Sequence, residues 1–290
     1  MSAAADLRGR AEALGQALPP LLAEAEHLAA TVILGDHGRR RAGTGDAFWQ
    51  YRPVVAGDSA RLIDWRRSAR GDAHFVRERE WQAAQSVTLW VDGSKSMAFS
   101  GQARRPAKGE RARLLALALA VLLVRGGERV GMAGGVAPPR AGRAQVLRMA
   151  QALGQAAVED YGAPDLTGLV AQGRAVFLSD FLGDPALVEA ALARAGDRGV
   201  TGAMLMVLDP AEEEFPFDGR TIFESMGGAI RHETRAAGDL RARYLERLAE
   251  RKARLAAMAA RAGWHLMVHH TGQPAQPALL WLYRALERGR

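Results

Sequence analysis

One third of the way along the chain, three polar residues follow an apolar run in the spacing Asp92-x-Ser94-x-Ser96. The run before them, SVTLWV at residues 86–91, is rich in β-branched and aromatic residues and predicts a buried strand. Carboxylate and hydroxyl oxygens on alternate residues of a loop can face one hard cation, such as Mg²⁺ or Mn²⁺. The pattern therefore predicts a divalent-cation site at the end of this strand.

A second aspartate, Asp180, ends another apolar run, AVFLSD at residues 175–180. In open α/β sheets, ligands bind outside the carboxyl ends of the strands, where the strand order reverses. If the two runs are neighbouring strands at this point, Asp92 and Asp180 converge with both serine hydroxyls. Alternatively, Asp92 and Ser94 only cap the structure that follows, because both residue types accept backbone N–H groups. The second strand-end aspartate favours the cation site.

Both runs belong to an alternation of strand-like and helix-like segments that begins at residue 86. Helices between strands require crossover connections and predict an α/β fold with a doubly wound, mostly parallel sheet. The strands are continuous apolar runs, as expected where both faces of the sheet are covered. The segment 211–234 fits neither period and predicts a hairpin excursion. We predict strands at 86–91, 128–136, 175–180, 201–209 and 264–270, a turn at 137–143, and helices at about 109–124, 144–157, 166–173, 185–196, 237–262 and 277–288.

The first 85 residues have a different character. Residues 6–31 carry Leu and Ala at helical spacing, interrupted by Pro19 and Pro20, and predict two helical pieces or one kinked helix. Residues 35–80 are rich in Gly, Asp and Arg around short β-like runs, which predicts an arm of hairpins and turns. We therefore divide the chain into residues 1–85, with the N-terminal helix and the β-hairpin arm, and residues 86–290, with the α/β domain.

The composition limits the possible functions. The chain of 290 residues is 48% hydrophobic, enough for a sizeable core, and its lack of cysteine excludes disulfides and thiolate metal sites. The net charge of +7 favours acidic partners. We predict no nucleic-acid binding, because the arginines are dispersed and no binding module is recognisable. The longest aliphatic run, residues 114–124, is too short to cross a bilayer, and we recognise no export signal, so we expect a cytoplasmic protein without a transmembrane segment.

The cation-site pattern also carries a resemblance. The stretch DGSKS, residues 92–96, resembles the metal-ion-dependent adhesion site of von Willebrand factor type A domains. Longer stretches between about residues 36 and 210 resemble a bacterial family of unknown function whose members contain that domain and are encoded beside MoxR-type AAA+ ATPases. The quoted stretches are GRRRAGTGDAFWQYRPVVAGDSARLIDWRRSARGDAHFVRERE, ERVGMAGG, PPRAGRAQVLRMAQAL and AVFLSDFLGDP.

This resemblance implies a Rossmann-like, von Willebrand type A-like fold with Mg²⁺ or Mn²⁺ at the strand tips. It implies a binding module and not a catalyst, with a MoxR-type AAA+ ATPase or its client as the partner. Carried over residue by residue, Asp92, Ser94 and Ser96 match the first metal motif, and Asp180 matches the late aspartate.

The chain departs from the family pattern in the middle metal loop. Where relatives are expected to have Thr-Asp-Leu, this sequence has Pro164, Asp165 and Leu166, followed by Thr167. Either Thr167 takes the missing ligand role through a shifted loop, or the site is incomplete and binds metal weakly. Lys95 within the motif either opposes the ion by Coulomb repulsion or points to solvent.

Other polar residues are interpreted as structural. Asp184 precedes Pro185 and predicts a helix N-cap. Residues 39–41, all arginine, predict a solvated run. His269 and His270 are neighbours in a strand and point to opposite faces, which argues against a shared metal. For three residues that match the family block, Asp58, Asp64 and Trp65, we predict arginine–aspartate pairs and a Trp that anchors the arm to the sheet.

The leading functional hypothesis is a metal-dependent protein-interaction module, an adaptor rather than an enzyme. Its Mg²⁺ would keep one coordination position open for a carboxylate of the partner. The first alternative is a metal-dependent phosphohydrolase that uses the same pocket, with Asp165 as the candidate general base. The second alternative is a metal-free scaffold that binds through the Arg-rich arm. Phosphate-binding-loop and nucleophile motifs are not found in the sequence.

Overall fold

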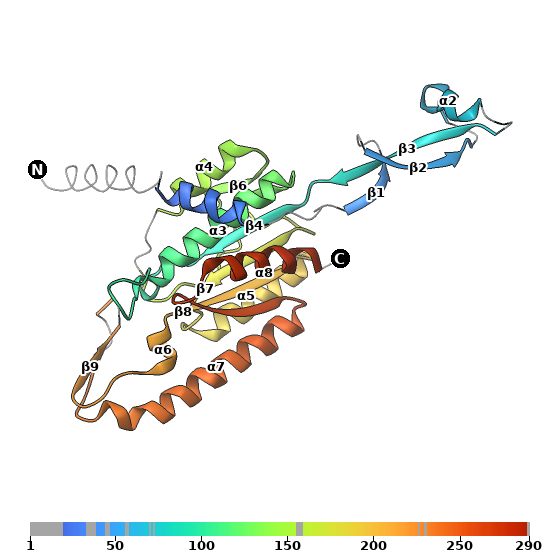
Figure 1. The fold of residues 1–290 in the computed structure, drawn as a ribbon. Coiled ribbons are helices and arrows are strands. Elements are labelled where there is room, and N and C mark those ends of the chain that lie inside the picture. The colour runs from blue at the N-terminus through green and yellow to red at the C-terminus, as the bar shows by residue number, and fades with distance from the viewer. Residues whose placement is uncertain are drawn as a thin grey trace, which may run out of the picture. The chain divides into compact units, whose positions relative to one another are not determined.

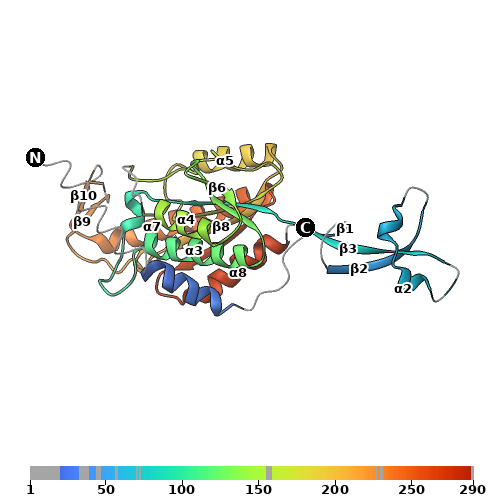
Figure 2. The same cartoon turned by 90° about the horizontal axis from the view of Figure 1, so that it is seen from above.

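The chain forms two compact units: the α/β unit, Met1–Gly35 with Ser86–Arg290, and the arm, Asp36–Gln85. Figures 1 and 2 show the elements of this computed structural model in two views. It describes residues 20–32, 39–43, 47–55, 58–69, 71, 73–154, 159–225, 227–228 and 231–288.

A six-stranded sheet with the order β11-β8-β7-β4-β5-β6 forms the centre of the α/β unit. Neighbouring strands are parallel, except that β6 runs antiparallel to β5 at the edge. The order along the sheet reverses between β4 and β7, the strands that precede the two aspartates. The predicted α/β class with a mostly parallel sheet is therefore confirmed. The strands are β4 (Ser86–Val91), β5 (Arg129–Met132), β6 (Ala137–Arg140), β7 (Arg174–Ser179), β8 (Thr201–Leu208) and β11 (His265–His270).

Helices cover both faces of this sheet (Figure 1). One hydrophobic core lies between the sheet and α3, α4 and α8, and a second lies between the sheet and α5 and α7. In β7, Val176 and Leu178 face the first core, whereas Ala175 and Phe177 face the second. Both faces are thus apolar, which explains why this strand is a continuous apolar run. The helices are α3 (Lys108–Arg125), α4 (Arg143–Ala152), α5 (Pro185–Asp197), α6 (Pro210–Glu214), α7 (Arg241–Arg261) and α8 (Ala275–Arg288).

The aliphatic run at residues 114–124 lies in α3, which contacts α4, α8 and four strands of the sheet. Its leucines are buried on all sides; Leu115, Leu117 and Leu119 are fully inaccessible. Among the described helices, none is both long enough and apolar enough to span a membrane. The predicted buried helix is therefore confirmed.

Two local predictions were wrong. The predicted turn at 137–143 contains strand β6, whose Pro138 and Pro139 are compatible with pairing because an edge strand needs fewer N–H donors. The predicted helix at 166–173 is instead a series of turns. Gly168 (φ 83°) and Gln172 (φ 57°) both adopt left-handed backbone conformations, which end any right-handed helix.

The predicted hairpin excursion at 211–234 is confirmed. It contains α6 and the antiparallel pair β9 (Thr221–Glu224) and β10 (Arg231–Thr234). A short 3-10 helix, Ala237–Leu240, then leads directly into α7. Phe215, at the end of α6, has a left-handed φ of 43° and packs against Phe217, Phe223 and Tyr244. The excursion is therefore held to α7 by aromatic contacts.

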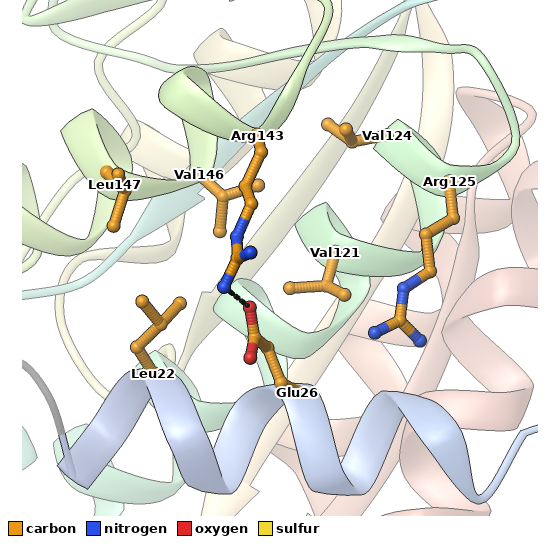
Figure 3. Close-up of a pocket in the computed structure, with 8 residues that line it drawn as sticks. All are labelled: Leu22, Glu26, Val121, Val124, Arg125, Arg143, Val146 and Leu147. Atoms are coloured by element: carbon orange, nitrogen blue, oxygen red, sulfur yellow. Dashed lines mark hydrogen bonds and ion pairs between the residues drawn. The ribbon is translucent and has the colours of Figure 1, made fainter.

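The N-terminal helix is described from residue 20 to residue 30, and the predicted interruption at Pro19 lies outside the described residues. Ala25 and Ala29 belong to the core that also contains α3, α4 and α8. A hollow of about 270 Å³ lies between this helix, α3 and α4. Glu26 and Arg143, which both line it, form an ion pair of 3.0 Å (Figure 3). The chain therefore divides between residues 85 and 86, where we placed the boundary, but the N-terminal helix belongs to the α/β unit, whereas the predicted division grouped it with the arm.

The arm contains the antiparallel sheet β1-β3-β2 and a short helix, α2 (Trp65–Ser68). Its predicted arginine–aspartate pair is Arg52 with Asp58, joined by two hydrogen bonds of 2.6 and 2.7 Å. These bonds lower the pKa of Asp58 to about 2. Asp64 caps α2, and the side chain of Trp65 is 57% exposed. The role of Trp65 in anchoring the arm to the sheet stays a prediction. The strands are β1 (Arg39–Gly43), β2 (Ala47–Pro53) and β3 (Phe75–Ala83); the side chains of residues 39–41 lie outside the described part.

Candidate functional site at the strand tips

The two strand-end aspartates lie at neighbouring strand tips. Strands β4 and β7 are hydrogen-bonded in parallel, with Val91 opposite Leu178. Asp92 and Asp180 follow these strands directly and are 2% and 1% exposed. The predicted adjacency of the two strands at the point of reversal is confirmed. It places both carboxylates at the carboxyl ends of the parallel strands, where ligands bind in such folds.

The Asp92 carboxylate is held by one donor on each oxygen. Its Oδ1 accepts from the backbone N–H of Ser94 at 2.8 Å, and its Oδ2 accepts from the hydroxyl of Ser179 at 2.6 Å. Ser179 is fully buried and also accepts from the N–H of Phe181 at 2.9 Å. It links the tips of β4 and β7, and sequence reasoning missed it, although it is a hydroxyl within an apolar run. Each Asp92 oxygen keeps a further lone pair for a ligand.

The hydroxyls of Ser94 and Ser96 converge. Both residues are buried, and their hydroxyls are hydrogen-bonded to each other, with the Oγ atoms 3.2 Å apart. A 3-10 helix, Lys95–Ala98, begins after Ser94 and turns the two side chains to the same side. In octahedral coordination with ligands at about 2.1 Å, adjacent ligand oxygens lie about 3.0 Å apart. The spacing of the two hydroxyls therefore fits one edge of a Mg²⁺ coordination sphere.

A loop at residues 159–162 lies against this motif. The backbone N–H groups of Lys95 and Ser96 donate to the carbonyls of Glu159 and Asp160 at 3.0 and 2.9 Å. A Cβ atom at Gly162 would overlap the Asp92 carboxylate, so glycine is required there. The Lys95 ammonium, on a side chain that is 39% exposed, lies 3.7 Å from the Asp160 carboxylate.

Asp180 is neutralised by a lysine that sequence reasoning missed. The Lys108 ammonium lies 2.8 Å from Asp180 Oδ2 and 2.6 Å from Glu212 Oε1, and the Lys108 side chain is 1% exposed. Burial lowers the pKa of Lys108, but the two carboxylates more than offset this and raise it, so the ammonium stays charged. The other Asp180 oxygen accepts from the N–H of Leu182 at 3.0 Å. Asp180 is therefore less accessible to a cation than Asp92.

The middle loop lies beside the end of β5, the other neighbour of β4. The N–H of Gly134 donates to the carbonyl of Thr167 at 3.0 Å. Asp165 is exposed, and its Oδ1 accepts from the N–H of Thr167 at 2.8 Å in a local turn. Pro164 is buried. Asp165 and Thr167 thus lie in a loop at the carboxyl ends of the parallel strands, as Asp92 and Asp180 do. Their role as metal ligands stays a prediction.

The small number of acidic side chains at the strand tips limits which metal ion the site can bind. Among the described residues, no group of three or more His, Asp or Glu side chains is placed to bind a metal ion. A cation at the strand tips would thus depend on Asp92 with the hydroxyls of Ser94 and Ser96. Mg²⁺ fits such a set, because it is usually bound by one or two carboxylates and keeps several waters.

Asp184 is the predicted helix N-cap. It precedes α5, accepts from the N–H of Ala186 at 2.9 Å, and is followed by Pro185 at the start of the helix. The two histidines of β11 also face different neighbours, as predicted. His270 Nε2 lies 2.5 Å from Glu213 Oε2, whereas His269 Nε2 lies 3.2 Å from the Arg111 guanidinium.

The buried His269 predicts a pH dependence of stability. Burial, with smaller effects of Arg111 and His270, lowers the pKa of His269 to about 4. Since the unfolded side chain has a pKa of about 6.5, the unfolded chain binds the extra proton between about pH 6.5 and pH 4. The contribution of this histidine to stability is complete above about pH 6.5 and is lost as the pH falls toward 4.

We expect His269→Gln to reduce the decline in unfolding free energy between pH 6.5 and pH 4.5 by up to about 1.4 kcal/mol per pH unit. Glutamine removes the titrating group and can still accept from Arg111. Denaturant titrations across this range measure the slope, and His265→Gln, at an exposed position of the same strand, is the control. Equal slopes for wild type and His269→Gln would contradict the assignment.

Comparison with known proteins assigns the chain to a family. The family model described as "Protein of unknown function DUF58" matches residues 50–254. An aerotolerance-related membrane protein from Bacteroides fragilis, with multiple mutations to serines, aligns with a TM-score of 0.40 at 16% identity, covering 71% of this chain and 100% of its own. The conserved hypothetical protein BatB from Bacteroides thetaiotaomicron aligns with a TM-score of 0.37 at 14% identity, with the same coverage. None of the curated proteins compared with the chain matches it. Because the family model spans well over half of the sequence, the protein belongs to the DUF58 family.

Proposed function

We propose that this protein is a non-catalytic interaction module in which Asp92, Ser94 and Ser96 hold Mg²⁺ or Mn²⁺ at the strand tips. The cation would keep a coordination position open for a carboxylate of a partner protein. Such a contact depends on the ion, because the residual positive charge of the metal attracts the partner group. By the family resemblance, the partner would be a MoxR-type AAA+ ATPase or its client.

The observation that carries this proposal is the 3.2 Å separation of the Ser94 and Ser96 hydroxyls. Two buried hydroxyls beside a buried carboxylate, at the point where the strand order reverses, match the donor types and spacing that Mg²⁺ uses. In this proposal Asp180 reaches the ion through a water molecule, since Lys108 and the N–H of Leu182 each already donate to one of its oxygens. Thr167 would approach from the loop beside β5.

A second candidate function is supported by Lys108. Its ammonium lies between Asp180 and Glu212 and supplies a positive charge there. A metal ion at the strand tips would otherwise supply such a charge. In this alternative the strand tips need no ion, and the protein is a metal-free scaffold. The two candidates differ in one measurable property, the response of the folded protein to divalent cations.

We expect Mg²⁺ to raise the Tm of the wild-type protein. A ligand that binds only the folded state stabilises it by about 2.7 kcal/mol at a concentration of 100 Kd. The double variant Ser94→Ala, Ser96→Ala should lose this response, because two of the three proposed ligands are removed. Thermal unfolding with 0 to about 20 mM Mg²⁺ or Mn²⁺, and with chelator, measures it.

Ser100→Ala is the matched control, since Ser100 donates to carbonyls of its own loop and lies outside the motif. A Tm that does not respond to either cation, in wild type and variant alike, would reject the metal site and favour the scaffold. The phosphohydrolase alternative stays a prediction: turnover of a generic phosphate ester with Mg²⁺ that is lost in Asp165→Asn would support it.

A further inference from the structure

A second pocket lies beyond Lys108, on the side of Glu212. It has a volume of about 500 Å³ and is formed by the excursion at 211–234, the 3-10 helix that follows it and the first turns of α7, together with Phe99. Its walls are mainly apolar and aromatic, and a few polar groups stand among them. The lining residues are Phe99, Ala211, Glu212, Phe215, Phe217, Phe223, His232, Leu240, Arg243, Tyr244 and Arg247.

The aromatic wall is built by contacts between the rings. Phe215 stacks on Phe223 with centroids 5.6 Å apart, and it packs against Tyr244 at 4.9 Å. Phe217 meets both phenylalanines edge to face, at 5.2 and 5.4 Å. Such a wall offers a large apolar group the contacts of a protein interior.

The α7 side of the pocket is cationic. Leu240, Arg243, Tyr244 and Arg247 recur at the spacing that places residues on one side of a helix. Arg243 and Arg247 are exposed, and within the described residues neither guanidinium is paired with a carboxylate. His232, on β10, adds a third basic group. Both arginines are therefore available to an anionic ligand.

Two further polar groups, the Tyr244 hydroxyl and the Glu212 carboxylate, are compatible with an anionic ligand on the α7 side of the pocket. Burial and then the charge of Glu212 raise the pKa of Tyr244 to about 12, so its hydroxyl is a neutral donor. In the described structure this hydroxyl has no hydrogen-bond partner. Glu212 itself is occupied, because Oε1 accepts from Lys108 at 2.6 Å and Oε2 from the N–H of Asp209 at 2.8 Å. Its charge is thus offset within the protein.

From this arrangement we infer that the pocket binds a peptide segment of a partner protein, with an aromatic side chain on the phenylalanine wall and flanking carboxylates on Arg243 and Arg247. Charge complementarity selects an acidic segment, and the volume suits one or two large side chains. The choice of a peptide rests on the proposed interaction function. Binding here needs no metal, so it does not depend on the cation site.

The test uses a fluorescein-labelled peptide, Glu-Glu-Phe-Glu-Trp-Glu, with the full-length protein at about 150 mM salt. We expect saturable anisotropy that is unchanged by chelator. Replacing both aromatic residues of the peptide by serine, or all of its glutamates by lysine, should weaken binding at least about tenfold, because one change removes the apolar contact and the other places like charges together. Weakening by only one of these changes would reject the combined apolar and anionic recognition.

Two double variants of the protein distinguish binding in this pocket from non-specific attraction between the peptide and the basic surface. We expect Arg243→Glu, Arg247→Glu to weaken the peptide at least about tenfold and Arg235→Glu, Arg241→Glu to leave it nearly unchanged, since the second pair is exposed, carries the same charge change and does not line the pocket. All four sites are exposed, so both variants should fold. Equal effects of the two variants, or no binding to wild type, would overturn the inference. A Tm response to Mg²⁺ in the same samples would leave the strand-tip proposal standing.

Discussion

Replacing Lys108 by methionine should destabilise the protein by about 3–5 kcal/mol, because it leaves Asp180 and Glu212 without their buried cation. Both carboxylates are then buried near each other without a neighbouring positive charge. For a chain of this size the Tm should fall by about 10 °C. Urea titration and thermal unfolding of Lys108→Met at pH 7 measure the loss.

The matched control is Lys252→Met. Lys252 pairs with Glu213, but both side chains are close to 30% exposed, so solvent screens the pair and the loss should stay below about 1 kcal/mol. The triple variant Lys108→Met, Asp180→Asn, Glu212→Gln should recover much of the stability, since no buried charge remains unpaired. If Lys108→Met were as stable as wild type, the ammonium would not hold these carboxylates in solution.

The same variant bears on the cation site. With Lys108 removed, Asp180 gains a free oxygen and an uncompensated charge beside Asp92. Mg²⁺ should therefore raise the Tm of Lys108→Met by more than that of the wild type. A smaller rise would indicate that the ammonium and the metal do not share the electrostatic environment of the strand tips.

The second large effect is expected from Gly202→Ala. Gly202 lies in β8 opposite Ala175 of β7, and a Cβ atom there would overlap the Ala175 carbonyl. Both strands are central and covered by helices on both faces, so neither backbone can move without breaking other strand pairs. We expect a loss of about 3 kcal/mol or more.

Gly196→Ala is the matched control with the opposite sign. Gly196 lies in α5, and a Cβ atom there would have nothing within 4 Å. Alanine should stabilise the helix by about 0.5–1 kcal/mol, because it restricts the unfolded chain. Denaturant titrations of the two variants should thus move the midpoint in opposite directions. A loss below about 1 kcal/mol for Gly202→Ala would show that the sheet adapts to the added methyl group.

Much of the fold was predictable because its signals are local. The apolar run at 86–91 and the run at 175–180 indicated strands buried on both faces, and the helix in 114–124 was indicated by length and composition. The turn at 137–143 was predicted wrongly because two consecutive prolines normally end a strand. They are accommodated at Pro138 and Pro139 only because β6 is an edge, and no local pattern reports which strand is the edge.

In the candidate site, too, residues with a local sequence signal were predicted and residues placed by long-range packing were not. Asp92, Ser94 and Ser96 were found because they follow one another along the chain and end an apolar run. Lys108 was missed because it lies at the start of α3, ahead of the aliphatic run at 114–124, where a lysine is ordinarily exposed to solvent.

By itself, the sequence determined the alternation of strands and helices, and it determined that two aspartates end apolar strands. These features depend on hydrophobic period and on neighbours a few residues away. Only the tertiary structure decided what surrounds the aspartates. Lys108 meets Asp180 across 72 residues and Glu212 across 104 residues of chain, and such an ion pair exists only after the helices pack on the sheet. Long-range electrostatic partners are set by packing, which no local pattern of residues encodes.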